Sequence, residues 1–167
     1  MAALIRPITQ GFVPQKEKKM ILSADVLLKN IFVKGRFFGW SRPDSCPRCN
    51  HWKVWGHGFR RSLFEGFDVP LYLKRYRCPC CGCIIVLRPS SHFNRFQTSK
   101  TAIRSALNQR IAHGKWPPSD HPGRLRHWLR NLKRQTQAHL TLRFRGGLMA
   151  AFDRLVGMGI VPVSRSI

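Results

Sequence analysis

The chain has 167 residues, enough for one modest domain or two small ones, and its 43% apolar content is ordinary for a folded protein. Thirty lysines and arginines stand against seven acidic residues and give a formal net charge of +23. A chain with this charge repels itself unless a polyanion is near, so the composition favours nucleic acid or an anionic membrane surface as a partner. No apolar run reaches the roughly 18 residues of a membrane-spanning helix, so we predict no such helix.

The distribution of the basic residues favours nucleic acid over a membrane. They are spread from Arg36 to Arg154, whereas membrane-binding proteins gather their charge in one amphipathic helix or in a tail beside an anchor. We therefore predict a long phosphate-binding surface and no membrane partner. The N-terminus shows no signal-peptide pattern, so we expect a cytoplasmic protein. In that reducing compartment, six cysteines are more typical of metal ligands than of disulfides.

The first 41 residues give the weakest structural signal. Residues 1–20 are predicted to be weakly ordered, and Met20 could be the initiator because a charged run precedes it directly. Residues 21–41 form a lead-in to the cysteine-containing part. In this lead-in we expect a short helix over Ser23–Leu28 and a strand over Ile31–Phe38.

Residues 42–91 contain all six cysteines and predict a small zinc ribbon of antiparallel strands. Two units of the form Cys-Pro-x-Cys, which supply Cys46 with Cys49 and Cys78 with Cys81, flank the predicted strands. A tetrahedral zinc site needs four soft ligands, and two such turns at the tips of β-hairpins provide them. The residues after the second cysteine of each turn, Asn50 and Gly82, suit a left-handed backbone. The strands are expected at Trp52–Trp55, Phe59–Phe64 and Val69–Arg77.

Cys80 and Cys83 give the second turn another possible register, because they also have Cys-x-x-Cys spacing. We prefer Cys78 and Cys81, which match the first turn in their proline and in the residue that follows. Two alternatives to zinc remain open. Iron in a rubredoxin-like site uses the same ligands, and a redox dithiol uses one such pair beside basic residues that lower its pKa.

Residues 98–157 predict a helical domain, which gives the whole chain an α+β class. Thr98 or Ser99 can cap a helix with Ile103, Ala106, Leu107 and Ile111 on its apolar face, and Gly114 would end it. A second helix begins near Asp120 or Pro122 and has Leu125, Trp128, Leu129 and Leu132 at helical spacing. A third covers Leu148–Val156, and residues 158–167 form a tail. The link between the first two helices is long for a helix-turn-helix, which is nevertheless the arrangement that we expect.

Two groups of basic residues are candidates for contact with nucleic acid. The ribbon group interleaves aromatic and basic side chains, as phosphate contact with stacking requires, and consists of Arg60, Arg61, Lys74, Arg75 and Arg77. The helical group lies outside the apolar face of the second helix and consists of Arg124, Arg126, Arg130, Lys133 and Arg134. Arginine can contact guanine with two hydrogen bonds in the major groove. The alternatives are that the ribbon aromatics pack in its core and that the helix follows phosphates without contacting bases.

The motifs also resemble a known family. The order Cys-Pro-Arg-Cys, His-Gly-Phe-Arg-Arg-Ser, Leu-Lys-Arg-Tyr-Arg-Cys-Pro-Cys-Cys-Gly and Leu-Arg-Pro-Ser is similar to the zinc ribbons of transposon-associated bacterial proteins. In insertion-sequence transposases of the four-cysteine kind, such a ribbon precedes a helix-turn-helix and then a catalytic RNase H-like domain. The resemblance covers residues 45–91 well and 98–135 loosely. It implies that Cys46, Cys49, Cys78 and Cys81 are the zinc ligands.

The chain departs from that family in one respect that bears on activity. Its residues after the ribbon are too few for the catalytic domain, and its seven acids are scattered. The transposase chemistry needs three carboxylates that hold two metal ions. We therefore expect no enzyme but a DNA-binding accessory protein or regulator related to transposases, whose partners would be DNA and either a transposase or further copies of this chain. The alternative is a basic zinc protein that binds RNA or the ribosome.

Overall fold

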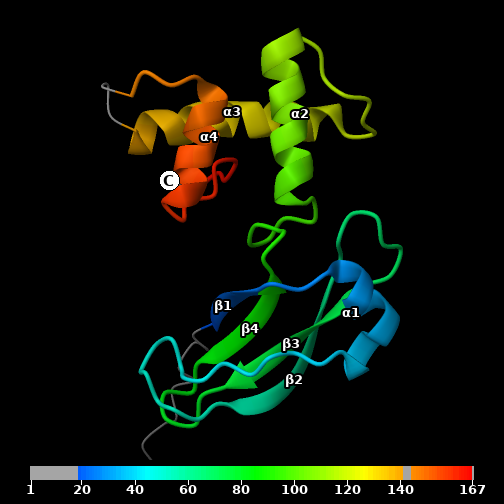
Figure 1. Cartoon of the computed structure of the whole chain (residues 1–167), viewed down its shortest axis with the longest axis vertical. Helices are drawn as coiled ribbons and strands as arrows, with labels where there is room; N and C mark the ends of the chain where they lie inside the picture. The colour runs from blue at the N-terminus through cyan, green and yellow to red at the C-terminus, as the bar shows by residue number, and fades with distance from the viewer. Residues whose placement is uncertain (1–18, 141–143, 167) are drawn as a thin grey trace, which may run out of the picture.

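Four strands of the described residues form a single sheet at one end of the molecule (Figure 1). The structure, a computed structural model, describes residues 19–140 and 144–166. The strands are β1 (Lys19–Ala24), β2 (Trp55–Ser62), β3 (Leu71–Arg77) and β4 (Ile84–Pro89), and their order in the sheet is β1-β4-β3-β2. β3 is antiparallel to both of its neighbours, whereas β1 is parallel to β4. The three strands inside residues 42–91 are antiparallel, as predicted for the ribbon, and the N-terminal lead-in adds a parallel strand that was not predicted.

The sequence pattern did not predict β4, although this strand lies inside the sheet. Its six residues read Ile-Ile-Val-Leu-Arg-Pro, and all except Arg88 are buried. A strand that is covered on both faces has a continuous apolar run in place of the alternation that marks a half-exposed strand. Val86 lies opposite Ile21 of β1 and Arg75 of β3, so β4 joins the lead-in to the ribbon.

The lead-in folds differently from its prediction. Ser23 lies in β1 and not in a helix, while helix α1 (Leu28–Lys34) and the short 3-10 turn η1 (Gly35–Phe37) replace the predicted strand. Gly35 follows α1 with a φ of 51°, a conformation that glycine adopts without a Cβ penalty. It therefore ends a helix where the sequence analysis expected a strand. Of residues 1–20, only the last two lie among the described residues, and they begin β1.

The predicted ribbon strands are confirmed in part. β2 and β3 correspond to the expected strands at Phe59–Phe64 and Val69–Arg77, with shifted ends. The expected strand at Trp52–Trp55 is wrong, since residues 51–54 are irregular and β2 starts only at Trp55. A register shift between Gly56 and Phe59 interrupts the pairing of β2 with β3.

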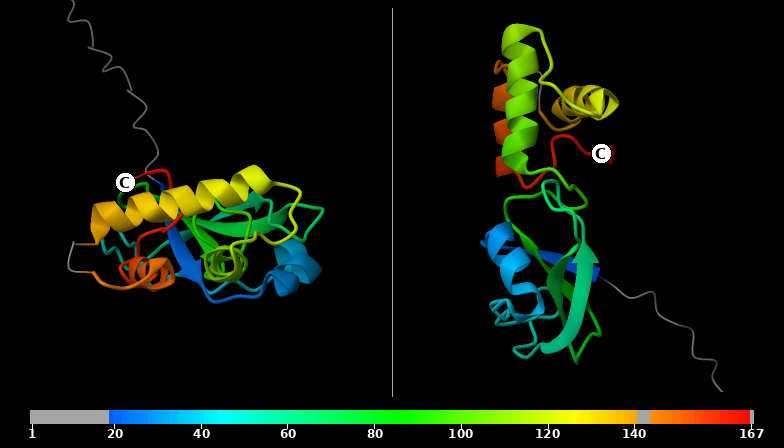
Figure 2. Two further views of the ribbon diagram at one scale, coloured as in Figure 1. Left: turned by 90° about the horizontal axis from the view of Figure 1, so that it is seen from above. Right: turned by 90° about the vertical axis from the view of Figure 1, so that its right-hand side faces the viewer.

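Three helices form the other end of the molecule: α2 (Lys100–His113), α3 (Pro122–His139) and α4 (Leu148–Gly157). The predicted cap of α2 is confirmed, because the Ser99 hydroxyl accepts a hydrogen bond from the Ala102 amide at 3.1 Å. Gly114 ends the helix with a φ of 69°. α3 runs across α2 and not along it (Figures 1 and 2).

The helices share a core of their own. Ile103, Leu107, Leu125, Trp128 and Leu132 are buried there together with Phe93, Phe152, Leu155 and Val163. The prediction for the α2 face fails at Ile111, which is 41% exposed. The residues after α4, which the sequence analysis set apart as a tail, fold back on α3. There the side-chain amide of Asn131 donates to the carbonyl of Val163 at 3.0 Å, and that of Gln135 donates to the carbonyl of Ser164 at 3.1 Å.

Candidate metal centre and basic surfaces

Two tight turns with the same backbone hydrogen bonds carry the cysteines. In the first turn, the Asn50 amide donates to the Cys46 carbonyl at 2.8 Å, and the Cys46 amide donates to the His51 carbonyl at 2.9 Å. The second turn, which starts at Cys78 between β3 and β4, repeats both bonds at the same spacing and at 3.0 Å. The chain thus builds the same cysteine-bearing turn twice and brings the two copies together.

The residues after each cysteine pair take the predicted left-handed backbone. Asn50 has a φ of 57° and Gly82 has a φ of 67°. Asparagine and glycine tolerate this region better than other residues do. The local sequence therefore accounts for the left-handed backbone at the end of each turn.

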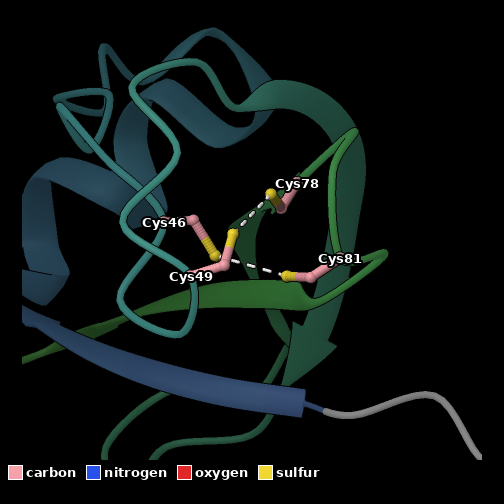
Figure 3. Close-up of side chains that lie close together, drawn as sticks. All are labelled: Cys46, Cys49, Cys78 and Cys81. Carbon is pink, nitrogen blue, oxygen red and sulfur yellow. Dashed lines mark hydrogen bonds between the residues drawn. The ribbon is translucent and has the colours of Figure 1, made fainter.

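The four predicted cysteine ligands, Cys46, Cys49, Cys78 and Cys81, lie together (Figure 3), with all four sulfur atoms within 4.8 Å of one another. The Cys46 and Cys81 sulfurs are 3.7 Å apart, and those of Cys49 and Cys78 are 3.5 Å apart. A tetrahedron of sulfurs with metal–sulfur bonds of about 2.3 Å has edges of about 3.8 Å. The cluster therefore has the size of a four-thiolate metal site and could hold one metal ion.

The electrostatics of the cluster also favour a cation. Burial alone would raise the pKa of the Cys46 thiol, but the Arg48 and Cys49 amides and the neighbouring sulfurs bring it down to about 7. The backbone of His51 favours the Cys49 thiolate, yet burial and the neighbouring sulfurs raise its pKa to about 12. Four thiolates at this spacing repel one another, so full ionisation of the cluster needs a positive ion among the sulfurs.

The remaining two cysteines lie outside the cluster. Cys80 is exposed, and Cys83 is fully buried behind the second turn, where it contributes its backbone carbonyl to the Cys78 amide. Burial, together with the nearby Cys46 and Cys81 sulfurs, raises the pKa of the Cys83 thiol. The structure thus groups Cys78 and Cys81, and not Cys80 and Cys83, with the first pair.

The ribbon group of basic residues is distributed along β2 and β3. Arg60, Arg61 and Arg77 are exposed, while Lys74 and Arg75 are half-buried. The Lys74 ammonium lies 4.5 Å from the centre of the Phe59 ring. The predicted interleaving of aromatic and basic side chains is therefore present in space, although Tyr76 itself is buried in the sheet.

The helical group lies on α3, whose buried face packs into the helical core. Arg126, Arg130, Lys133 and Arg134 are exposed. Arg124 differs from them, since its guanidinium donates to the Glu65 carboxylate at 2.9 Å and lies 5.3 Å from the Trp128 ring centre. Arg124 thus links α3 to the loop after β2.

Two recessed basic areas contain residues that the sequence analysis missed. One, which we call the helical recess, lies between α2 and α3, has a volume of about 320 Å³ and is lined by Arg110, Trp116, Arg126, Leu129, Arg130 and Lys133. The Arg110 guanidinium lies 5.6 Å from the Trp116 ring centre. The other lies beside the sheet and includes Arg88 and Arg95. Arg110 belongs to α2 and Trp116 to the link before α3, so only the packing of the two helices shows that these residues lie beside the basic side chains of α3.

We compared the chain with models of known families, with curated proteins and with solved structures, and none of the three comparisons gave a match. Of the helices in the described part of the chain, none has the length and apolar character needed to cross a membrane.

Proposed function

We propose that the protein binds one zinc ion at Cys46, Cys49, Cys78 and Cys81 and uses its basic surfaces to bind nucleic acid, with DNA as the target. The observation that carries the proposal is the helical recess, in which one tryptophan, one leucine and four basic side chains meet. Trp116 is partly exposed, and cationic groups beside such a ring provide phosphate contact and stacking together. Seven acids in the whole chain cannot neutralise thirty cations, so a polyanion is the expected complement.

Helix α3 is the element that we propose for groove contact. Arg126, Arg130 and Lys133 have the spacing i, i+4 and i+7, which puts them on one side of the helix. The opposite side carries Leu125, Trp128 and Leu132 and is held in the helical core. A helix fixed in this way can enter the major groove, about 12 Å wide, with its arginines first. α2, the eight-residue link and α3 would then serve as a helix-turn-helix with a long turn.

The sheet would contribute contacts of a different kind. The exposed side chains of Arg60 and Arg61 belong to β2, an edge strand of the sheet. Long cationic side chains on a strand can reach phosphates without entering a groove. We therefore propose that the ribbon group positions the protein on the DNA through phosphate contacts, and that the helical group contacts the bases.

Zinc is preferred over iron as the metal. The spacing of the sulfurs fits either ion, because both accept four thiolates in a tetrahedron. A zinc ion with four thiolates changes the charge of the chain only slightly and adds rigidity, which suits a binding protein. An electron carrier would gain nothing evident from a net charge of +23.

We propose a binding protein and not an enzyme. Within the part of the chain that the structure describes, Asp153 forms an ion pair with Arg104 at 2.7 Å, and Glu65 forms one with Arg124 at 2.9 Å. A two-metal nuclease or transposase site needs several carboxylates close together. The relation to transposases rests on the resemblance of the motifs, and it favours an accessory or regulatory role at mobile elements. Partners would then be a transposase or further copies of this chain.

The proposed division between α3 and the ribbon is tested by two matched substitutions. After selection of a preferred duplex, the affinities of Arg126→Gln and Arg61→Gln are measured on that duplex and on random duplex at several salt concentrations. Loss of Arg126 should reduce the preference for the selected site by about 1–3 kcal/mol. Loss of Arg61 should weaken binding to both duplexes equally. It should also reduce the slope of log K against log salt concentration by about 0.9 for each lost phosphate contact.

Two other results would change the proposal. If Arg126→Gln and Arg61→Gln lose affinity equally on both duplexes, α3 follows phosphates and does not contact bases. If single-stranded RNA displaces the duplex from the wild-type protein at equal concentration, the RNA-binding alternative replaces DNA binding. Absence of binding to either nucleic acid would contradict the proposed function altogether.

A further inference from the structure

Beside the sheet lie two recesses with volumes of about 500 and 490 Å³. Both are lined by Arg60 of β2, Arg88 of β4 and Arg95 of the segment that leads from β4 to α2. Because the recesses share these three side chains, they adjoin. We call the region around the shared arginines the junction pocket.

The junction pocket gathers positively charged side chains. Neither recess has an aspartate or glutamate of the described part of the chain in its lining. Burial and the nearby cation of Arg60 both lower the pKa of Arg88, so the two guanidinium groups are close enough to repel each other. Three converging arginines with no acid among the described lining residues repel one another and are favourable around an anion.

Arg88 is held in a fixed position for such a contact. Its guanidinium donates to the Phe93 and Phe96 carbonyls and lies 4.9 Å from the centre of the Phe64 ring. A guanidinium has five N–H groups, so three stay outside these two bonds. The side chain is therefore ordered before a ligand arrives, which reduces the entropy cost of binding.

Arg95 occupies a backbone position that favours another residue type. The Phe96 amide donates to the Phe93 carbonyl at 3.2 Å, which closes a four-residue turn with Arg95 at its third position. Arg95 has a φ of 67°. A type II turn has this positive φ at its third position and normally has glycine or asparagine there. The side chain of Arg95 thus stands in the pocket at the expense of backbone strain, a pattern typical of functional sites.

We propose that the junction pocket is a phosphate-binding site, with Arg60, Arg88 and Arg95 as the contacting residues. Planar guanidinium groups match the oxygens of a phosphate and are the usual choice for this contact. The source of the phosphate rests on the proposed function: the phosphate belongs to the backbone of the bound nucleic acid, at the point where this backbone passes from the sheet to the helices. The free phosphate of a nucleotide is the other source of the same chemistry.

The test compares two double variants of the full-length zinc-loaded protein with the same loss of charge. Arg60→Gln with Arg95→Gln removes two pocket arginines, while Arg145→Gln with Arg154→Gln removes two exposed arginines far along the chain. Fluorescence anisotropy of a labelled duplex and calorimetric titration with ADP are the two arms. The pocket variant should bind the duplex at least tenfold more weakly than the control variant.

The arms separate the two phosphate sources. If the pocket variant loses affinity for the duplex but not for ADP, the pocket binds the nucleic-acid backbone. If it loses affinity for ADP alone, the pocket binds a free nucleotide. If the pocket variant matches the control in both arms, the junction pocket is not a phosphate site, even where the wild type binds DNA. If the wild type binds ADP but no nucleic acid, the pocket stands and the proposed function fails.

A single substitution separates a loss of affinity from a loss of folding. Arg95→Gly relieves the positive φ, so its thermal midpoint should equal or exceed that of the wild type. Its affinity for the phosphate ligand should nevertheless fall by the same factor as that of Arg95→Gln. Wild-type affinity in Arg95→Gly would overturn the role of Arg95.

Discussion

Single residues determine which sulfurs the two turns present. In each turn, the residue four positions after the first cysteine takes a positive φ and donates its amide to the carbonyl of that cysteine. In the second turn this residue is Gly82, which fixes Cys78 as the first cysteine of the pair. The alternative pair, which begins at Cys80, would need the same conformation at Ile84, a β-branched residue already committed to β4. The backbone thus decides between two registers that cysteine spacing alone leaves equal.

The register leads to a prediction about metal content. Cys78→Ser should lose the metal, because a ligand disappears and metal binding in so small a unit is coupled to its folding. Cys80→Ser is the matched control, because this side chain is exposed and lies outside the cluster. Elemental analysis of both purified variants gives the answer. Full occupancy in Cys78→Ser together with loss in Cys80→Ser would show that the register is wrong.

His92 leads to a second prediction, which concerns pH. Burial first, and then the cation of Arg88, lower the pKa of this imidazole from 6.5 to about 4. The unfolded chain therefore binds a proton between these values that the folded chain does not, so the free energy of unfolding falls as the pH drops from 6.5 towards 4. The loss through His92 should be roughly 1–3 kcal/mol.

Denaturant unfolding across this pH range measures the effect in two variants. His92→Gln should show a flatter pH dependence than the wild type. His113→Gln is the control, because this histidine is exposed at the end of α2, and it should keep the wild-type dependence. Identical slopes for His92→Gln and the wild type would show that His92 does not titrate in this way.

At the scale of elements, local signals made α2 predictable and β1, β4 and α1 unpredictable. Ser99 and Gly114 mark the two ends of α2, and both are confirmed at their predicted positions. β1 and β4 depend on each other, since Ile21 and Val86 pair across a sequence distance that no local pattern spans. For α1, a run of seven residues with one buried side chain gives no periodicity strong enough to separate helix from strand.

The cap of α2 can be tested on its own. Ser99→Ala removes the hydroxyl that accepts from the Ala102 amide, and this should lower the free energy of unfolding by about 1 kcal/mol. Ser105→Ala is the matched control, since Ser105 is exposed within the helix and alanine is the better helix former there. Urea unfolding of the two variants compares them directly. A loss of equal size in Ser105→Ala would mean that the cap contributes nothing specific.

On the scale of the whole molecule, the sheet and the three long helices have separate apolar cores. The sheet has two buried clusters: Cys46, Cys78, Cys83, Val54 and Ile85 surround the candidate metal centre, and Ile31, Phe64, Leu71, Leu73, Ile84 and Val86 form the other. The helical core is formed by α2, α3 and α4. The sequence could predict both groups, because each has its own local signal. The sequence could not predict how the sheet and the helices meet. Two sets of contacts join them: the Arg88 guanidinium donates to the Phe93 and Phe96 carbonyls, and Arg124 donates to the Glu65 carboxylate. The junction pocket lies at this joint, which explains why Arg88 and Arg95 escaped the sequence analysis.

The separation of the cores predicts what removal of the metal does. Without an ion, four sulfurs within 4.8 Å of one another lose the group that balances their charge, and both turns lose their common centre. The core around Cys46 and Cys78 should open, because in small metal-binding units the binding energy is the folding energy. The helical core contains none of the four cysteines, so α2, α3 and α4 should stay folded.

Amide hydrogen exchange before and after treatment with a chelator resolves the two regions, with protection expected to vanish in β3 and β4 and to persist in α2 and α3. If protection vanishes from both regions together, the contacts at the joint couple the cores into one cooperative unit, and the ribbon then has no folding transition of its own.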